Sequence, residues 1–337
     1  MITIQTLFCM VKMRSLSTDL SLGAQTSYAE LSDMAGGVEK ARFGALRGSF
    51  HRRQINGNTY VYFNFRDVDG RGCSVYVGPE SARVQGLVSE FERSLVAESL
   101  IALSRRAQAC LALGCSGLPT KHFRTIQKLV GYGFFRGGGV LGGTHAFVTL
   151  GDMLGVRWAG GGNAMCAELA RTESRISIAL PMEFEALTHD AITSLEAGLL
   201  PIREFSRRAS AHRRDDKAPE LGIQFIMPNN EGKRASRVSN LTIELEPRKF
   251  TDLLLDDLSH GVVFAKSGAC RVNVPDPARF AVHNLVVYGD GSIPERLTLI
   301  GLLDQAAALT EWHMDQQRIR QFRAVWQDVL ARGPTWR

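Results

Sequence analysis

A glycine-rich segment near the middle of the chain is the first stretch whose residues could carry chemistry. Residues 134–155 read FFRGGGVLGGTHAFVTLGDMLG, which predicts a short buried strand at 140–141, a turn at Gly142, Gly143 and Thr144, and then a helix. Glycines in such a turn let the backbone approach a ligand closely, and the first amides of the helix then face an anion. The turn is therefore a candidate phosphate site, although many α/β proteins carry such a turn for packing alone.

Arginine supplies a second kind of candidate chemistry. Lys and Arg number 40 against 34 acidic residues, a net charge of +6. Two segments concentrate arginine, the aromatic stretch 48–79 and the charged loop 203–217. Guanidinium groups bind phosphate well, so both segments could contact nucleic acid, and the plain alternative is a mildly basic, solvated surface. The candidate nucleic-acid residues are Arg52, Arg53, Arg207, Arg208, Arg213 and Arg214.

The six cysteines argue against a zinc site or a disulfide framework. None stands in a CxxC pair, and no His accompanies Cys110 and Cys115. Hydrophobic residues make up 45% and charged residues 22%, which is typical of a globular protein with a sizeable core. No run approaches the roughly 18 apolar residues that a membrane span needs. We therefore expect a cytoplasmic protein that does not enter a membrane.

Periodicity and turn signals predict the elements that must position these residues. The N-terminal part has a helix at 26–41, a three-strand meander at 48–55, 59–66 and 72–77, one long helix or a kinked pair at 81–113, and a helix at 122–132. The later part has strands at 166–169, 176–180 and 223–227, a helix at 184–197, a hairpin at 262–274, and helices from 280, at 297–309 and at 315–331.

Segments of different texture suggest four parts. Residues 1–25 are expected to form a disordered extension, and residues 26–133 the N-terminal helix, meander and helical region. The change of texture at residue 134 suggests that residues 134–280 form a core domain, followed by C-terminal helices at 281–337. The fold class expected from this order is α+β.

The order of these pieces resembles a bacterial nucleotidyltransferase-fold family of the DNA-polymerase-β-like type. The resemblance covers roughly residues 26–309, and the order and spacing of its motifs make it fairly specific. It implies a mixed sheet with flanking helices. The motifs are YAEL at 28–31, the aromatic hairpin ending at Gly78-Pro79, GTHAF at 143–147, ISIALP at 176–181, Leu200-Pro201 and PDPARFAVH at 275–283.

In active members, the resemblance implies, a glycine turn holds the triphosphate of an NTP. Three carboxylates on neighbouring strands bind two Mg²⁺ ions, because hard cations clustered at the transferring phosphoryl group require anionic oxygens. The matching positions here are Gly142, Gly143 and Thr144 for the triphosphate, Cys166, Glu168 and Gln224 for the carboxylates, and Arg279 and His283 as further nucleotide contacts.

The carboxylate positions depart from the family pattern. Cys166 offers a soft ligand that does not suit magnesium, Gln224 offers a neutral oxygen, and only Glu168 keeps a carboxylate. The ligand charge would fall from about −3 to about −1. Because the departures fall on polar positions while the apolar framework is kept, our hypothesis is a catalytically degenerate protein, a pseudoenzyme. It would act as a nucleotide- or RNA-binding or assembly subunit, with a protein partner or a second copy of the chain.

Two other functions remain open. The first is an active Mg²⁺-dependent nucleotidyltransferase that moves an NMP from an NTP onto RNA or protein. The second is a nucleic-acid-binding module that uses the arginine-rich hairpin and loop. Each functional residue also has a plainer role: Glu168 could pair with a nearby arginine, Arg279 could hold a helix end or a carboxylate, and His283 could be a hydrogen-bonded core residue. In the active case, a nearby carboxylate would replace a lost ligand, from Asp152, Glu173, Glu183, Glu185 or Asp190.

Overall fold

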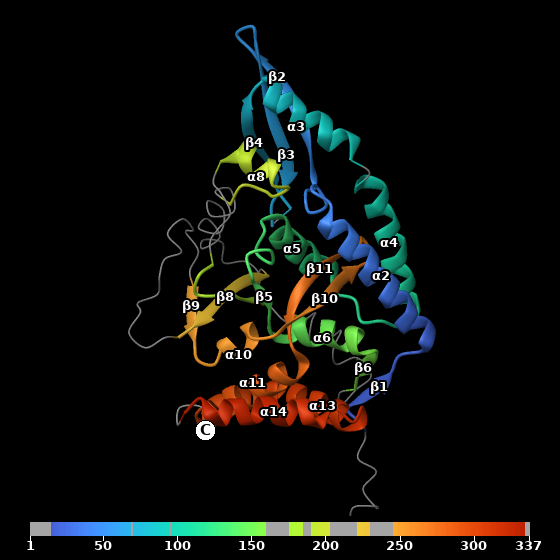
Figure 1. Ribbon diagram of the computed structural model, residues 1–337, viewed down its shortest axis with the longest axis vertical. Coiled ribbons are helices and arrows are strands. Elements are labelled where there is room, and N and C mark those ends of the chain that lie inside the picture. Colours follow the sequence, from blue (N-terminus) through green and yellow to red (C-terminus); the bar gives the residue numbers. More distant parts are fainter. Residues whose placement is uncertain are drawn as a thin grey trace, which may run out of the picture.

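The computed structural model describes residues 15–68, 70–94, 96–159, 175–184, 190–202, 221–229 and 245–333. Helices and sheets are mixed along the chain, which confirms the α+β class. The meander forms one end of an elongated molecule, the mixed sheet and a long hairpin its middle, and a layer of C-terminal helices the other end (Figure 1).

The predicted meander is confirmed. Strands β2 (Gly48–Ile55), β3 (Asn58–Arg66) and β4 (Gly72–Pro79) pair antiparallel in that order. Asn56 and Gly57 take φ values of 52° and 80°, as a tight hairpin turn requires. Alternate residues of β3, among them Phe63, are buried beneath α3 (Ala82–Arg93), and the Phe63 ring meets the edge of Phe91 at 5.8 Å.

The mixed sheet has the strand order β5-β7-β8-β9. Strand β5 (Val140–Leu141) runs antiparallel to β7 (Arg175–Ala179), and β8 (Gly222–Pro228) and β9 (Leu245–Arg248) continue parallel to β7. Helix α6 (Gly143–Leu154) begins directly after β5, as the strand–turn–helix pattern predicted. The side chains of Ile176, Ile178 and Phe225 are buried in the core.

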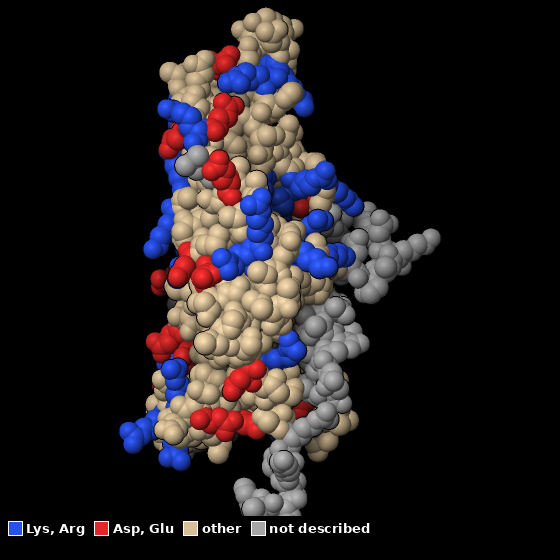
Figure 2. All heavy atoms as spheres, turned by 90° about the vertical axis from the view of Figure 1, so that its right-hand side faces the viewer, with Lys and Arg blue, Asp and Glu red and all other residues tan. Residues whose placement is uncertain are grey.

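The hairpin of β10 (Leu258–Ala265) and β11 (Gly268–Pro275) was also predicted, and several helices pack against it, among them α6. Helix α2 (Leu22–Lys40) contacts α4 (Val96–Ala112) and both hairpin strands, and α5 (Thr120–Gly131) also contacts the hairpin. Lys and Arg side chains gather at mid-height on the face turned to the viewer in Figure 2, with Asp and Glu interspersed. This mixture of signs agrees with the modest net charge.

The N-terminal residues differ from the expected extension over 1–25. Strand β1 (Ser17–Asp19) pairs with β6 (Val156–Trp158), and α2 starts four residues before the expected helix. The Ser21 hydroxyl caps α2 by accepting from the Ala24 amide at 3.2 Å, and Leu20 and Ala24 are buried. This start is not evident from the sequence, because the residues that pack against Leu20 and Ala24 come from remote segments of the chain.

Other boundaries follow from caps. The segment 81–113 forms two helices, because α3 ends at Arg93 with Ser94 as its C-cap, so the kinked-pair alternative holds. Of the helix expected at 184–197, the structure describes α8 (Ala191–Glu196), whose N-cap is Asp190. Residues 185–189 lie outside the described residues. The remaining helices are α10 (Asp252–Leu255), α11 (Pro277–Asp290), α12 (Ile293–Thr298), α13 (Ile300–Asp315) and α14 (Ile319–Ala331).

The hydrophobic core crosses the boundary expected at residue 134. One cluster joins Phe63 of the meander, Phe123 of α5, Ile178 of the mixed sheet and Phe280 of α11. The Phe134 ring itself stacks on Phe225 with ring centres 5.0 Å apart. The change of sequence texture therefore marks a change of element type within a shared core. Among the described helices, none is both long and apolar enough to cross a membrane.

Candidate functional site

The glycine turn has the backbone geometry of a phosphate cradle. Gly142 is extended, and its amide donates to the Ser177 carbonyl at 2.9 Å, while Gly143 takes a left-handed φ of 58° as the first residue of α6. The first amides of a helix have no intrahelical acceptor, and the helix dipole favours an anion there. Gly143 is half-buried between buried neighbours, so the turn remains accessible at this residue. Phosphate binding at the turn stays a prediction.

A row of polar side chains lies on the sheet beside the turn. Ser177 of β7 lies opposite Gln224 of β8 in the strand register, and a Cβ atom on Gly143 would come within 3.8 Å of the Ser177 Cβ. The amide Nε2 of Gln224 donates to Oε2 of Glu246 on β9. Glu246 also pairs with Arg248 at 2.5 Å. The row thus contains a hydroxyl, an amide and one carboxylate.

Glu246 is the residue that sequence reasoning missed. Its signal was the alternation in residues 242–248, TIELEPR, where Glu244 and Glu246 flank Leu245 as one polar face of a strand. No strand was expected between the one at 223–227 and the hairpin at 262–274, and β9 extends the sheet there. Its pairing with β8 brings Glu246 next to Gln224.

The other carboxylate positions divide into two groups. Cys166, Glu168, Glu173 and Glu185 lie outside the described residues, as do Arg207, Arg208, Arg213 and Arg214. Asp152 is buried in the last turn of α6 and accepts from the Ser116 amide at 2.7 Å, and burial raises its pKa to about 7. Asp190 is occupied as the cap of α8, where the Thr193 hydroxyl and amide lower its pKa, and Glu183 is exposed.

The donors that the structure describes at this site do not fit two magnesium ions. Two Mg²⁺ ions in one site need several anionic oxygens, and the row offers the single carboxylate of Glu246, already engaged by Gln224 and Arg248. Across the described ranges, no three His, Cys, Asp or Glu side chains are grouped to hold a metal ion.

A buried histidine pair supports the start of α6. His145 follows Thr144 of the turn, and its Nε2 lies 2.9 Å from Nδ1 of His122 near the start of α5. Burial lowers the pKa of both rings, that of His145 to about 3, so the pair is uncharged at neutral pH and one ring donates to the other. The pair joins two helix starts, and Nδ1 of His145 is buried without a hydrogen-bond partner among the described residues.

Arg279 and His283 occupy structural positions on α11. The Arg279 guanidinium donates to Asp257 at 2.6 Å and to Asp328 at 3.2 Å, and it lies 3.5 Å from Asp256. We call Arg279, Arg332, Asp256, Asp257 and Asp328 the α11 ion cluster, since Arg332 also pairs with Asp256 and Asp328. His283 is half-buried, with its Nδ1 3.3 Å from the side-chain oxygen Oδ1 of Asn284, and burial lowers its pKa to about 4. These contacts correspond to the plainer roles expected for both residues.

The two candidate nucleic-acid arginines of the meander, Arg52 and Arg53, differ in their surroundings. The Arg53 guanidinium lies over the Tyr62 ring, 4.9 Å from its centre, whereas Arg52 pairs with Glu80 at 3.1 Å. Tyr76 adds a third group, with its ring centre 5.5 Å from Tyr62 and 6.1 Å from Tyr60. We call Arg53, Tyr60, Tyr62 and Tyr76 the tyrosine platform.

Comparison with known proteins places the chain by family. No curated protein and no solved structure shows significant similarity to it. A family described as nucleotidyltransferase matches residues 120–331, which include the glycine turn, the mixed sheet and the C-terminal helices. Since the match covers well over half of the chain, the protein belongs to this nucleotidyltransferase family.

Proposed function

We propose that this member of the family binds a nucleotide at the glycine turn and has lost two-metal catalysis. The observation that carries the proposal is the hydrogen bond from the Gln224 amide to Glu246, at a sheet position where the family resemblance implies a carboxylate. An amide at residue 224 supplies a donor to Glu246. A carboxylate there would instead repel Glu246 unless a cation lay between them. The Gln224 amide thus provides the favourable contact with Glu246 that a bound cation would otherwise provide.

The turn supports retained nucleotide binding. Gly143 keeps its left-handed backbone, and the β7 residue opposite it is the small Ser177. The missing Cβ at Gly143 therefore leaves room for a phosphate group beside the first amides of α6. In this proposal the protein acts as a nucleotide- or RNA-binding or assembly subunit, and it does not use Mg²⁺ as a cofactor.

Label transfer tests the loss of catalysis. The full chain is incubated with each labelled NTP, Mg²⁺ or Mn²⁺, and total RNA or cell protein, beside Glu246→Ala and Glu168→Ala. We expect no label on any acceptor. Transfer that disappears in either variant would overturn the proposal in favour of an active nucleotidyltransferase that places an NMP on RNA or protein.

A matched pair of glycine substitutions tests nucleotide binding. Gly143 and Gly57 both have positive φ, and a Cβ would meet no atom closer than 3.8 Å at Gly143 and none within 4 Å at Gly57. Both Gly→Ala changes should therefore cost about 1 kcal/mol of stability through backbone strain alone. Only Gly143→Ala should weaken NTP binding in titration calorimetry, by tenfold or more. Equal affinities in the two variants would remove the turn from the site.

The tyrosine platform supports a second candidate function, binding of single-stranded nucleic acid. Exposed aromatic rings beside a guanidinium are the pattern on which unpaired bases stack. Tyr76 is 47% exposed, and Arg53 is held over Tyr62. Because Arg52 points to the opposite face of β2 and is paired with Glu80, Arg52→Met is a matched control for Arg53→Met.

Oligonucleotide titrations at several salt concentrations test this candidate. We expect Tyr76→Ala to weaken RNA binding, and Arg53→Met to weaken it and reduce the salt slope by about one. Arg52→Met should leave both quantities unchanged. Binding that is absent, or insensitive to salt, removes the candidate.

A further inference from the structure

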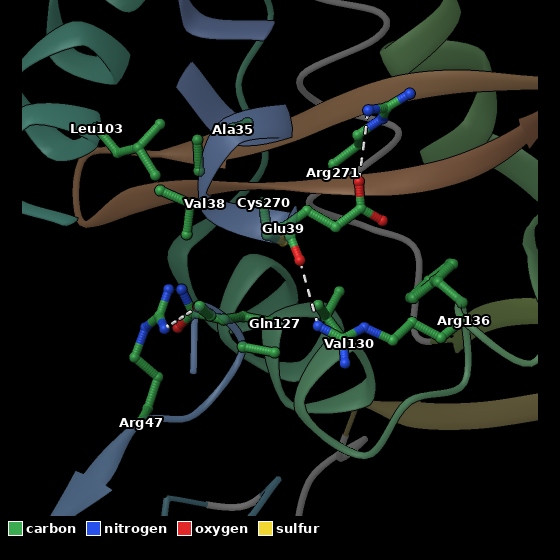
Figure 3. Close-up of a pocket in the computed structure, with 14 residues that line it drawn as sticks. Ala35, Val38, Glu39, Arg47, Leu103, Gln127, Val130, Arg136, Cys270 and Arg271 are labelled. Atoms are coloured by element: carbon green, nitrogen blue, oxygen red, sulfur yellow. Dashed lines mark hydrogen bonds and ion pairs between the residues drawn. The ribbon is translucent and has the colours of Figure 1, made fainter. Parts of the chain in front are cut away.

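A cavity with three arginines lies away from the glycine turn. It is lined by α2, the loop after it, α4, α5, the turn after α5 and strand β11, and it holds about 30 Å³ of free space. Its charged lining consists of Arg47, Arg136, Arg271 and Glu39, which we call the arginine cavity. In Figure 3 the Arg47 and Arg136 side chains enter from different sides, and Arg271 lies beside Glu39. No lining residue belongs to the glycine turn or to β7, β8 or β9.

Arg47 has no anionic partner among the described residues. Its Nη1 donates to the backbone carbonyls of Gly44 at 2.6 Å and Leu46 at 3.2 Å. A guanidinium has five N–H groups, so the donors on its other two nitrogens have no acceptor in the described part of the chain. Burial lowers the pKa of Arg47, but an arginine side chain does not give up its proton in a protein. The side chain is half-buried, so its charge is partly desolvated, and no carboxylate among the described residues balances it.

The neighbours do not neutralise this charge. The Cys270 thiol lines the cavity, but burial raises its pKa to about 12, so it is uncharged at neutral pH. Burial, and then the positive charge of Arg47, lower the pKa of Lys128 to about 8. Among the described residues of the lining, Glu39 is the single carboxylate, and its side chain already meets Arg271 at 3.4 Å. Arg136 donates to the Glu39 backbone carbonyl at 3.2 Å and to that of Ala197 at 3.2 Å.

We propose that the arginine cavity binds a phosphate-sized oxyanion, with Arg47 as its principal contact and Arg136 and Arg271 as further cations. The free space suits one tetrahedral oxyanion and is too small for a nucleoside. Guanidinium groups match phosphate oxygens in charge and geometry. The anion supplies the counter-charge that Arg47 lacks. It also joins α2 and its following loop to α5 and β11, so binding stabilises the junction between the N-terminal helix and the hairpin.

Thermal unfolding in phosphate tests the proposal. The full chain is compared with Arg47→Met and with Arg105→Met, an exposed arginine of α4 outside the cavity. Melting temperatures are measured in millimolar phosphate and in chloride of equal ionic strength. We expect phosphate to raise the melting temperature of the native chain and of Arg105→Met, as ligand binding to the folded state requires. Arg47→Met should respond at least tenfold more weakly, with a melting temperature in chloride no lower than that of the native chain.

Two outcomes would overturn the proposal: an equal phosphate response in all three proteins, which indicates a general salt effect, or no response in the native chain. If Arg47→Met does not fold, Arg136→Met takes its place in the same comparison, because its side chain is exposed. Inorganic phosphate, a nucleoside 5′-monophosphate and the nucleoside alone distinguish a free anion from a phosphate on a larger ligand. Gly143→Ala should keep the inorganic phosphate response, which separates this site from the glycine turn.

Discussion

The α11 ion cluster and the arginine cavity are both built around arginine, but carboxylates outnumber arginines in the first and arginines outnumber carboxylates in the second. In the α11 ion cluster, two arginines face three aspartates, and Arg279 contacts a carboxylate on each side of it. In the arginine cavity, three arginines face Glu39, and Arg47 bonds only backbone carbonyls among the described residues. The first arrangement is complete within the chain, while the second needs an anion from outside. Arginine content therefore predicts neither role, and the placement of carboxylates decides between them.

The largest expected difference between the two regions appears when the central arginine of each is replaced. Arg279→Met leaves Asp256, Asp257 and Asp328 without it, and the Arg279 side chain is only 15% exposed. We expect the free energy of unfolding to fall by about 2 kcal/mol, less than for a fully buried pair because the aspartates reach solvent. Arg47→Met should change it by less than about 0.5 kcal/mol, or raise it, in buffer without phosphate. Urea denaturation measures both, and equal losses would contradict the comparison.

Acid should affect buried histidines and paired aspartates in different pH ranges. The folded-state pKa of His145 is about 3, below its usual 6.5, so the unfolded chain binds the extra proton between these values. The stability that His145 contributes is therefore lost as pH falls below about 6.5, at up to about 1.4 kcal/mol per pH unit. The pKa of Asp328 is held low, first by the hydrogen bond from Arg332. Its contribution persists above the usual pKa of 3.8 and is lost only as pH falls further.

Variants separate these two pH ranges from the contribution of Asp152. Because the pKa of Asp152 is raised to about 7, its protonation stabilises the folded chain as pH falls from about 7 to 4, which opposes the effect of His145. The stability gap between the native chain and His145→Gln should narrow from about pH 6.5 downward. The gap between the native chain and Arg279→Met should stay constant to about pH 4 and then close. A single common range for both gaps would show that the assignment of the protons is wrong.

Gln224→Glu would place two carboxylates side by side, which is an excess of negative charge where the arginine cavity has an excess of positive charge. Two carboxylates would then meet where Gln224 now donates to Glu246, and we expect a loss of about 1 kcal/mol at neutral pH. Millimolar Mg²⁺ should recover this loss, because a cation between the carboxylates replaces the amide donor. Thermal unfolding with and without Mg²⁺ measures the effect, with exposed Gln85→Glu as the control. Destabilisation that Mg²⁺ leaves unchanged would argue against a vestigial cation position.

The smallest expected effect involves two adjacent glycines in α2. A Cβ on Gly36 would lie 3.2 Å from Nη1 of Arg271, while a Cβ on Gly37 would meet no atom within 4 Å. Gly37→Ala should stabilise the chain by about 0.5–1 kcal/mol through helix propensity. Gly36→Ala should gain less, since Arg271 must shift, and it should also weaken the phosphate response. Urea denaturation and the phosphate melting curves measure the two effects, and identical behaviour of the two variants would place Arg271 outside the site.

Local patterns predicted much of the fold. Asn56-Gly57 between alternating strands specified the meander, and the run from Val140 to the helix after Thr144 specified the strand, turn and helix. The start of α2 at Leu22 was missed, because its apolar face is clear only when β1 pairs with β6. Glu246 was missed for a related reason, since the position of β9 depends on pairing with β8 and not on its own residues.

The sequence by itself determined the meander, the strand, turn and helix around Gly143, the backbone freedom of that glycine and the family to which the chain belongs. These properties depend on residue type and spacing, which are local. Only the tertiary structure decided which charges meet. It surrounded Arg279 with aspartates from separate elements, placed the half-buried Arg47 beside the uncharged Cys270, and joined Gln224 to Glu246 across two strands. Electrostatic roles depend on distance and burial, and both are settled only when remote segments pack together.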